Sequence, residues 1–140
     1  MDKGQLDEAA NELRAAIKID PGAFNPQLNL GIVLIQQKKS SEALTALNIA
    51  LSIEPSAPAA HLYAGMASID LNDTMRGVKE LNAAFDLGGN TYAVALLHLG
   101  KVYMKEGERE MALKSFESYL RELPNAPDAA QVQQLISRLH

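Results

Sequence analysis

The chain has no cysteine and no tryptophan, and only 5% of its 140 residues are aromatic. Without cysteine it can form neither a disulfide framework nor a thiolate metal site. No run of about 18 apolar residues is present that could cross a bilayer, and Asp2 and Lys3 open an amphipathic segment rather than a signal peptide. The net charge of −4 disfavours nucleic acid and anionic membranes as partners, because binding to phosphates depends on clustered Lys and Arg. We therefore expect neither nucleic acid binding nor direct membrane insertion.

A repeat of 34 residues runs through the chain. Steps of this length lead from Pro21 to Pro55 and from Gly31 to Gly65. The clearest copy, residues 27–55, has an apolar helical face, a polar break, and a second apolar face that ends at a proline. A fixed period of this length is typical of stacked two-helix units. We predict an all-α protein, an α-solenoid of antiparallel helix pairs with about eight helices.

The repeat divides a single domain, residues 1–140, into five segments. Residues 1–23 form the second helix of an incomplete repeat, 24–57 a repeat, 58–92 a divergent repeat, 93–126 a repeat, and 127–140 a capping helix. Ser41 is predicted to cap the second helix of the repeat 24–57, and Pro58 to open the first helix of the next. Because the helix in 1–23 lacks its antiparallel mate, we expect the chain to be a domain or fragment of a longer protein.

The segment 58–92 departs from the pattern of its neighbours. Ala64 and Ser68 replace larger residues, and Gly77 replaces a small alanine at a cost of about 1 kcal/mol in a helix interior. The step from Gly65 to the equivalent glycine at 100 is 35 residues, one more than the period. We expect a softer or differently packed repeat with a bend near Gly88-Gly89.

These features resemble the tetratricopeptide repeat family, in particular its bacterial members. The match rests on small and large apolar residues at the family's spacing: Leu30, Gly31, Leu34, Ala43, Leu47, Ala50 and Pro55 in one repeat, and Leu99, Gly100, Tyr103, Gly107, Ala112, Phe116 and Pro124 in another. The resemblance covers nearly the whole chain. It implies a right-handed superhelix whose first helices line a concave groove, which typically holds a peptide or helix of a partner protein.

If the family geometry holds, the partner-binding groove is mostly apolar. Its predicted lining residues are Leu28, Ile32, Ile35, Leu62, Met66, Ile69, Val94, Leu97, Lys101, Met104 and Lys105. The resemblance excludes one ligand class, the C-terminal carboxylates of chaperones, since the places that need Lys, Arg and Asn hold Leu28, Ile32, Tyr63, Val94 and His98. We predict an interaction scaffold that binds an apolar or amphipathic helix or peptide. The competing interpretation is that these apolar residues are core, because a stripe at helical spacing usually faces a core.

A homo-oligomer is the alternative function. The apolar stripe Leu6, Leu13 and Ile17 in the unpaired first helix motivates it, because exposed apolar patches usually find a partner, here another copy of the chain.

We expect no enzymatic activity, no cofactor and no metal site. The three histidines are scattered at 61, 98 and 140, and no pair has the spacing of a zinc-binding helix. His98 could lie at the groove edge, although a surface position is favoured. Localisation stays open between the cytoplasm and, if an upstream signal is missing from this chain, the bacterial envelope (periplasm).

Overall fold

The computed structural model describes all 140 residues and contains eight α-helices, one short 3-10 helix and no strand. The elements are α1 (Lys3–Ile19), α2 (Phe24–Gln36), α3 (Ser40–Ile53), α4 (Pro58–Asp70), α5 (Thr74–Gly88), the 3-10 helix η1 (Gly89–Tyr92), α6 (Val94–Lys105), α7 (Arg109–Glu122) and α8 (Ala129–Leu139). No helix is both long enough and apolar enough to cross a membrane.

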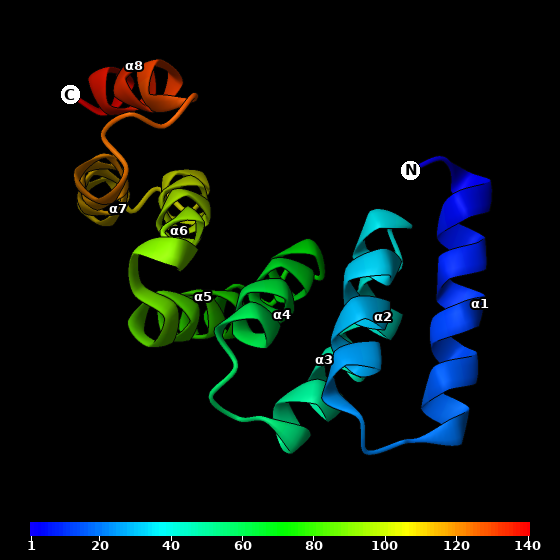
Figure 1. Cartoon of the computed structure of the whole chain (residues 1–140). Helices are drawn as coiled ribbons and strands as arrows, with labels where there is room; N and C mark the ends of the chain where they lie inside the picture. Colours follow the sequence, from blue (N-terminus) through cyan, green and yellow to red (C-terminus); the bar gives the residue numbers. More distant parts are fainter.

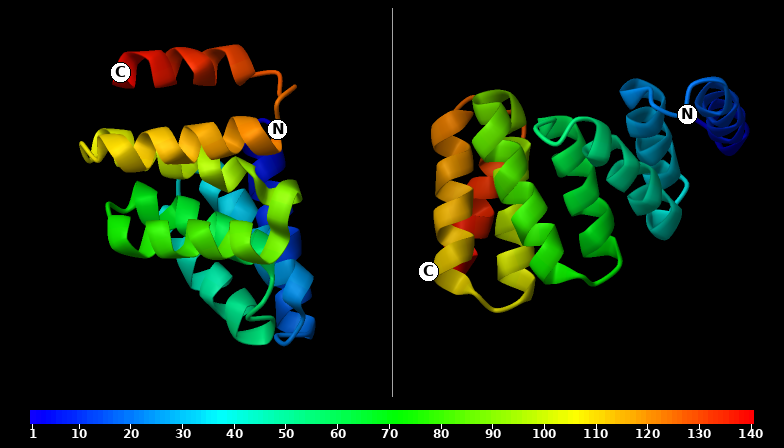
Figure 2. Two further views of the ribbon diagram at one scale, coloured as in Figure 1. Left: turned by 90° about the vertical axis from the view of Figure 1, so that its left-hand side faces the viewer. Right: turned by 90° about the horizontal axis from the view of Figure 1, so that it is seen from below.

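The helices stack as hairpins along an open arc, with α1 at one end and α8 at the other (Figure 1). The pairs α2–α3, α4–α5 and α6–α7 form the hairpins, α1 packs on α2, and α8 packs on α7. Figure 2 shows the hairpins side by side and α8 as a further layer. The first helices of successive hairpins contact one another, α2 with α4 and α4 with α6, more closely than the second helices do. They therefore form the inner side of the arc, and the predicted α-solenoid is confirmed.

Each hairpin turns at a residue in the left-handed region of backbone space. Lys38 and Asn72 have φ of 62°, and Gly107 has φ of 81°. The residue after each turn donates its amide to a carbonyl five positions earlier, as Lys39 does to Leu34 at 2.8 Å and Glu108 to Tyr103 at 2.8 Å. This closure satisfies carbonyls that the helix end would leave unpaired.

The predicted helix starts are partly correct. Pro58 is the first residue of α4, as predicted. Ser41 is not an N-cap: α3 begins one residue earlier, after Lys39, and no side chain caps it. The turn at Lys38 brings the chain into helical geometry before Ser41 is reached, and the carbonyl of Ser41 accepts a hydrogen bond from the Thr45 hydroxyl at 3.3 Å.

Glycines allow close packing within the hairpins. A Cβ at Gly31 would lie 2.5 Å from Cγ of Leu47, and one at Gly100 would lie 2.5 Å from Cδ1 of Phe116. These distances leave no room for a side chain, so each glycine lets a large residue of the second helix reach the backbone of the first.

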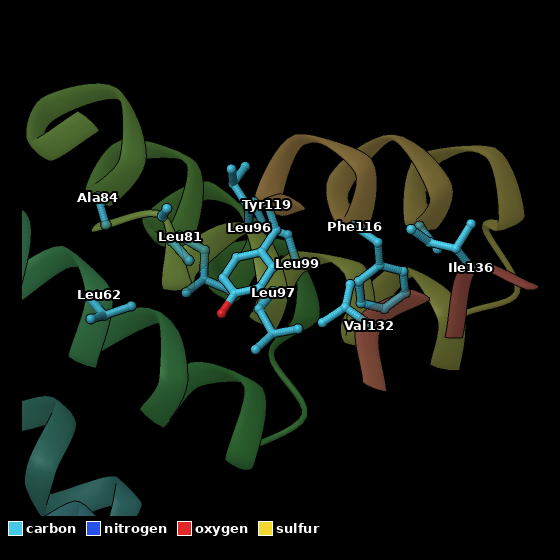
Figure 3. Close-up of a cluster of buried hydrophobic side chains, with 13 residues drawn as sticks. Leu62, Leu81, Ala84, Leu96, Leu97, Leu99, Phe116, Tyr119, Val132 and Ile136 are labelled. Carbon is cyan, nitrogen blue, oxygen red and sulfur yellow. The ribbon is translucent and has the colours of Figure 1, made fainter. Parts of the chain in front are cut away.

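The core follows the stack in two clusters. The N-terminal cluster joins α1 to α4 and includes Leu30, Leu34 and Leu47. The C-terminal cluster joins α4 to α8, and Figure 3 shows Val132 of α8 beside Phe116 of α7 within it. The cap helix is thus held by side chains of the last hairpin.

The bend predicted near Gly88-Gly89 lies between α5 and α6. Gly89 follows α5 with φ of 60°, a value that favours glycine, and η1 leads from it to α6. This extra turn accounts for the 35-residue step between Gly65 and Gly100.

Candidate functional site

A cavity of about 240 Å³ lies between α4 and α6 on the inner side of the arc. We call it the α4–α6 cavity. Its residues are apolar at the walls and mostly charged at the rim: Met66, Ile69, Leu81 and Val102, then Asp70, His98, Lys101 and Lys105. Leu81 of α5 is fully buried and lies beneath the two first helices. The arrangement can receive an apolar side chain and can contact charged groups around it.

The divergent repeat shapes this cavity. Ile69 packs against α5 at Gly77, where a Cβ atom would lie 2.7 Å from its Cγ1. The neighbouring repeats have Ala43 and Ala112 at the position of Gly77. The missing methyl group therefore lets Ile69 lie close to α5 rather than further into the cavity.

The charges at the rim are predominantly positive. Lys101 and Lys105 are exposed and form no ion pair. Asp70 accepts a hydrogen bond from the Ser40 hydroxyl at 3.1 Å. Burial, and to a smaller extent the positive charge of Lys101, lowers the pKa of His98 from its ordinary 6.5. His98 is therefore neutral at pH 7, and the positive charge comes from the two lysines.

A second cavity, of about 230 Å³, continues the surface from α6 to α8. It is lined by Leu97, Lys101, Asp128, Gln131, Val132, Gln134, Leu135 and Arg138. Asp128 accepts a hydrogen bond from the Tyr119 hydroxyl at 2.7 Å. Because Lys101 borders both cavities, they form neighbouring parts of one surface, which we call the C-terminal groove.

The structure brings five of the predicted groove residues to the C-terminal groove. Met66, Ile69, Lys101 and Lys105 line the α4–α6 cavity, and Leu97 lines the second cavity together with Lys101. Met104 is exposed and Val94 half-buried, and neither lines these two cavities.

The remaining predicted groove residues lie elsewhere. Leu28, Ile32 and Ile35 are half-buried on α2, and Leu28 and Ile35 pack against the N-terminal cluster. Leu62 is only 7% exposed and belongs to the C-terminal cluster, so a core position describes it better than a groove position. Leu97, which lines the second cavity, is 8% exposed and belongs to the same cluster.

The stripe on α1 is not a free surface. Leu6 is 9% exposed and belongs to the N-terminal cluster, and Leu13 and Ile17 pack against that cluster. Since α1 lies on α2, this stripe meets the first helix of the following hairpin within the same chain. Packing within the chain therefore buries Leu6 and covers Leu13 and Ile17 in part.

Four residues of the α4–α6 cavity, namely Asp70, Leu81, His98 and Val102, were not among the predicted groove residues. His98 was expected at the surface, and Leu81 and Val102 were not singled out. Val102 lies eight residues after Val94 and three before Lys105 on α6, so helical spacing from these predicted positions could have indicated it. Leu81 lies on α5, the second helix of its hairpin. Its sequence position indicates a core residue, and nothing in the sequence indicates that it also lines the cavity.

Histidines and carboxylates are not grouped as metal ligands: no three such side chains lie together. His61 instead makes a structural pair, with its Nδ1 at 2.6 Å from Glu80 and its Nε2 at 2.7 Å from the carbonyl of Pro55.

Comparison with known proteins agrees with the repeat geometry. Two family models described as tetratricopeptide repeat match residues 1–69 and 94–126. No curated protein sequence matches the chain.

Similar solved structures share the fold. The crystal structure of MamA has a TM-score of 0.86 at 24% identity, covering 97% of this chain and 79% of that one. PilF of Pseudomonas aeruginosa has a TM-score of 0.84 at 21% identity, covering 98% of this chain and 61% of that one. A tetratricopeptide repeat protein from Parabacteroides merdae has a TM-score of 0.81 at 22% identity, covering 99% and 55%. Together with the two family models, the stacked hairpins show that the chain belongs to the tetratricopeptide repeat family.

Proposed function

We propose that this protein is an interaction module that binds an apolar or amphipathic helix or peptide of a partner protein in its C-terminal groove. Its family supports a general role in protein–protein interaction, and solenoids present extended concave surfaces suited to that role. The family consists generally of scaffolds without enzymatic activity, and we propose no catalytic role.

The α4–α6 cavity is the observation that carries the proposal. Its volume is about 240 Å³, and its walls include Met66, Ile69 and Val102. An apolar cavity of about 150 Å³ is large enough to bind benzene. A leucine, methionine or phenylalanine side chain of a partner therefore fits this cavity.

The expected affinity is modest. Burying one apolar side chain contributes about 1.5–3 kcal/mol, so anchors in both cavities contribute about 3–6 kcal/mol together. Association itself costs about 4–15 kcal/mol. Further contacts along the groove are needed, and we expect dissociation constants on the order of micromolar or weaker.

Peptide selection tests the proposal. A displayed library of short peptides is selected on the wild-type chain, and the recovered peptides are tested on Met66→Glu, which places a charge in the cavity wall. The matched control is Met111→Glu, which changes an exposed methionine on α7, outside both cavities. We expect recovered peptides to share an apolar anchor and to lose binding to Met66→Glu but not to Met111→Glu. Peptides that bind both variants equally, with intact helical circular dichroism, would place the binding surface elsewhere.

The homo-oligomer is the second candidate, and it has less support. Leu6 is buried, and Leu13 and Ile17 are half-buried against the N-terminal cluster, so packing within the chain already covers part of this stripe. Light scattering at high protein concentration shows whether the chain forms an oligomer. An oligomer that fills the groove would also block binding of the selected peptides.

A further inference from the structure

The C-terminal groove carries unpaired positive charge on an otherwise acidic protein. The whole chain has a net charge of −4. Lys101, Lys105 and Arg138 nevertheless lie at the two cavities, and none of them forms an ion pair within the chain. The two carboxylates in the same lining, Asp70 and Asp128, each accept a hydrogen bond from a hydroxyl group.

The two lysines repel each other across one helical turn. Lys101 and Lys105 are four residues apart on α6 and border the same cavity. Like charges at this spacing destabilise a helix slightly. An anion placed between them is attracted by both lysines, which offsets their mutual repulsion. The rim therefore favours negatively charged groups at the mouth of an apolar cavity.

We propose that the partner segment is an acidic amphipathic peptide, which places an apolar side chain in the α4–α6 cavity and Asp or Glu carboxylates against Lys101 and Lys105. This inference rests on the proposed function, since it names the chemistry of the segment that the C-terminal groove binds. The apolar side chain supplies most of the affinity through burial. The carboxylates select the partner, because a basic segment would bring like charge to the rim.

His98 supports the same assignment. It lies beside Lys101 in the cavity, and its lowered pKa keeps it neutral at pH 7. A neutral imidazole adds no positive charge to the rim, so the charge there comes from Lys101 and Lys105, which are exposed to solvent.

Three matched synthetic peptides test the proposal. Each is an N-acetylated amphipathic helix with leucines along one face, and the positions flanking the central leucine are Glu, Gln or Lys. Binding is measured by fluorescence anisotropy at low salt and at about 0.5 M salt. We expect the Glu peptide to bind severalfold and at most about tenfold more tightly than the Gln peptide, because exposed ion pairs contribute little individually. The Lys peptide is expected to bind more weakly than either.

Protein variants locate the effect. Replacing both lysines, Lys101→Gln with Lys105→Gln, is expected to remove the preference for Glu over Gln. The control variant carries Lys79→Gln with Lys114→Gln, which removes two exposed lysines from the outer helices α5 and α7, and it is expected to keep the preference.

The outcomes separate this inference from the function on which it rests. If the Glu and Gln peptides bind equally well, and both lose binding to Met66→Glu, the partner is not selected by acidic residues. The groove is then an apolar binding site, as the proposed function states. A Glu preference that survives loss of Lys101 and Lys105 also overturns the inference. Failure of all three peptides to bind, while peptides selected from a library bind at Met66, overturns it as well. If selection yields no peptide that depends on Met66, the proposed function itself fails.

Discussion

Ile69 of α4 packs directly over Gly77 of α5: a Cβ atom at residue 77 would lie 2.7 Å from Cγ1 of Ile69. The same isoleucine forms a wall of the α4–α6 cavity. Because Gly77 has no side chain, Ile69 of α4 packs close to the backbone of α5. The residue type at 77 therefore sets the position of Ile69 in the cavity wall.

Gly77→Ala is therefore expected to reduce peptide binding without unfolding the protein. The new methyl group adds about 1 kcal/mol of helix propensity, whereas overpacking against Ile69 costs about 1–3 kcal/mol. We expect the free energy of unfolding in urea to fall by no more than about 2 kcal/mol. Ile69 is displaced towards the cavity, so the affinity for a leucine-anchored peptide is expected to fall by at least about tenfold.

The control for this prediction is Gly4→Ala. Gly4 lies in the first turn of α1, far along the chain from the cavity, and an added Cβ would meet no atom closer than 3.4 Å. It changes helix propensity alone. A Gly77→Ala protein with unchanged peptide affinity would show that Ile69 does not limit the cavity.

Residue spacing predicted the fold but only part of the site. The 34-residue period and the glycine positions were sufficient for the hairpins, because each hairpin uses a small residue opposite a large one, as Gly100 does opposite Phe116. The sequence also marked Gly77 as a departure. It could not show that Ile69 fills the space, since that depends on the rotamer adopted and on the distance between α4 and α5.

The division between groove and core residues also depends on geometry. Met66 and Leu62 are four residues apart on α4, yet Met66 lines the cavity and Leu62 belongs to the core. This difference depends on how the neighbouring helices pack around α4, and helical spacing alone does not predict it. For the same reason, the stripe with Leu6 on α1 could not be recognised as the surface that meets α2.

His98 is expected to make stability depend on pH below about 6.5. Burial, followed by the charge of Lys101, lowers the pKa of His98 in the folded protein. His98 therefore binds a proton more readily in the unfolded chain than in the folded protein. By linkage, the stabilisation from neutral His98 is present above the pKa of His98 in the unfolded chain, and it is lost as the pH falls through the pKa of His98 in the folded protein. We expect His98→Gln to reduce the loss of unfolding free energy between about pH 7.5 and about pH 5.

Urea unfolding of both proteins at the two pH values measures this effect. His140→Gln, at the exposed chain end, is the matched control and is expected to keep the pH dependence of the wild type. An unchanged pH dependence in His98→Gln would mean that His98 titrates equally in both states.

The His61–Glu80 pair is expected to couple α4 and α5 energetically. The atoms Nδ1 and Oε2 are 2.6 Å apart, and the two side chains are only 16% and 10% exposed. We expect a double-mutant cycle of His61→Ala and Glu80→Ala to give a coupling energy of about 1–2 kcal/mol in urea unfolding.

A second cycle provides the control for this pair. Glu117 is exposed on α7 and does not contact His61, so His61→Ala and Glu117→Ala are expected to be additive within about 0.5 kcal/mol. Equal coupling in both cycles would assign the effect to a general change of charge rather than to the hydrogen bond.

The hydrogen bond between Tyr119 and Asp128 is expected to hold α8 on α7 and to weaken in alkali. The Tyr119 hydroxyl donates to Oδ1 of Asp128 at 2.7 Å. Burial, with the hydrogen bond and charge of Asp128, raises the pKa of Tyr119 from 10.0 to about 12. A raised pKa stabilises the folded state fully below about pH 10, and this contribution is lost as pH rises through about 12. Tyr119→Phe is therefore expected to cost about 1–2 kcal/mol at neutral pH.

This prediction is tested by the difference in unfolding free energy between wild type and Tyr119→Phe. Unfolding in urea is monitored by circular dichroism from neutral pH to about pH 11.5. We expect the difference to be constant up to about pH 9.5 and to shrink above it, because only the wild type carries the perturbed phenol. Tyr103→Phe removes a hydroxyl that makes no hydrogen bond and controls for the loss of the group itself. A difference that stays constant into strong alkali would show that Asp128 is not the partner that holds the phenolic proton, and the attachment of α8 would then rest on its other contacts, such as those of Val132 and Ile136.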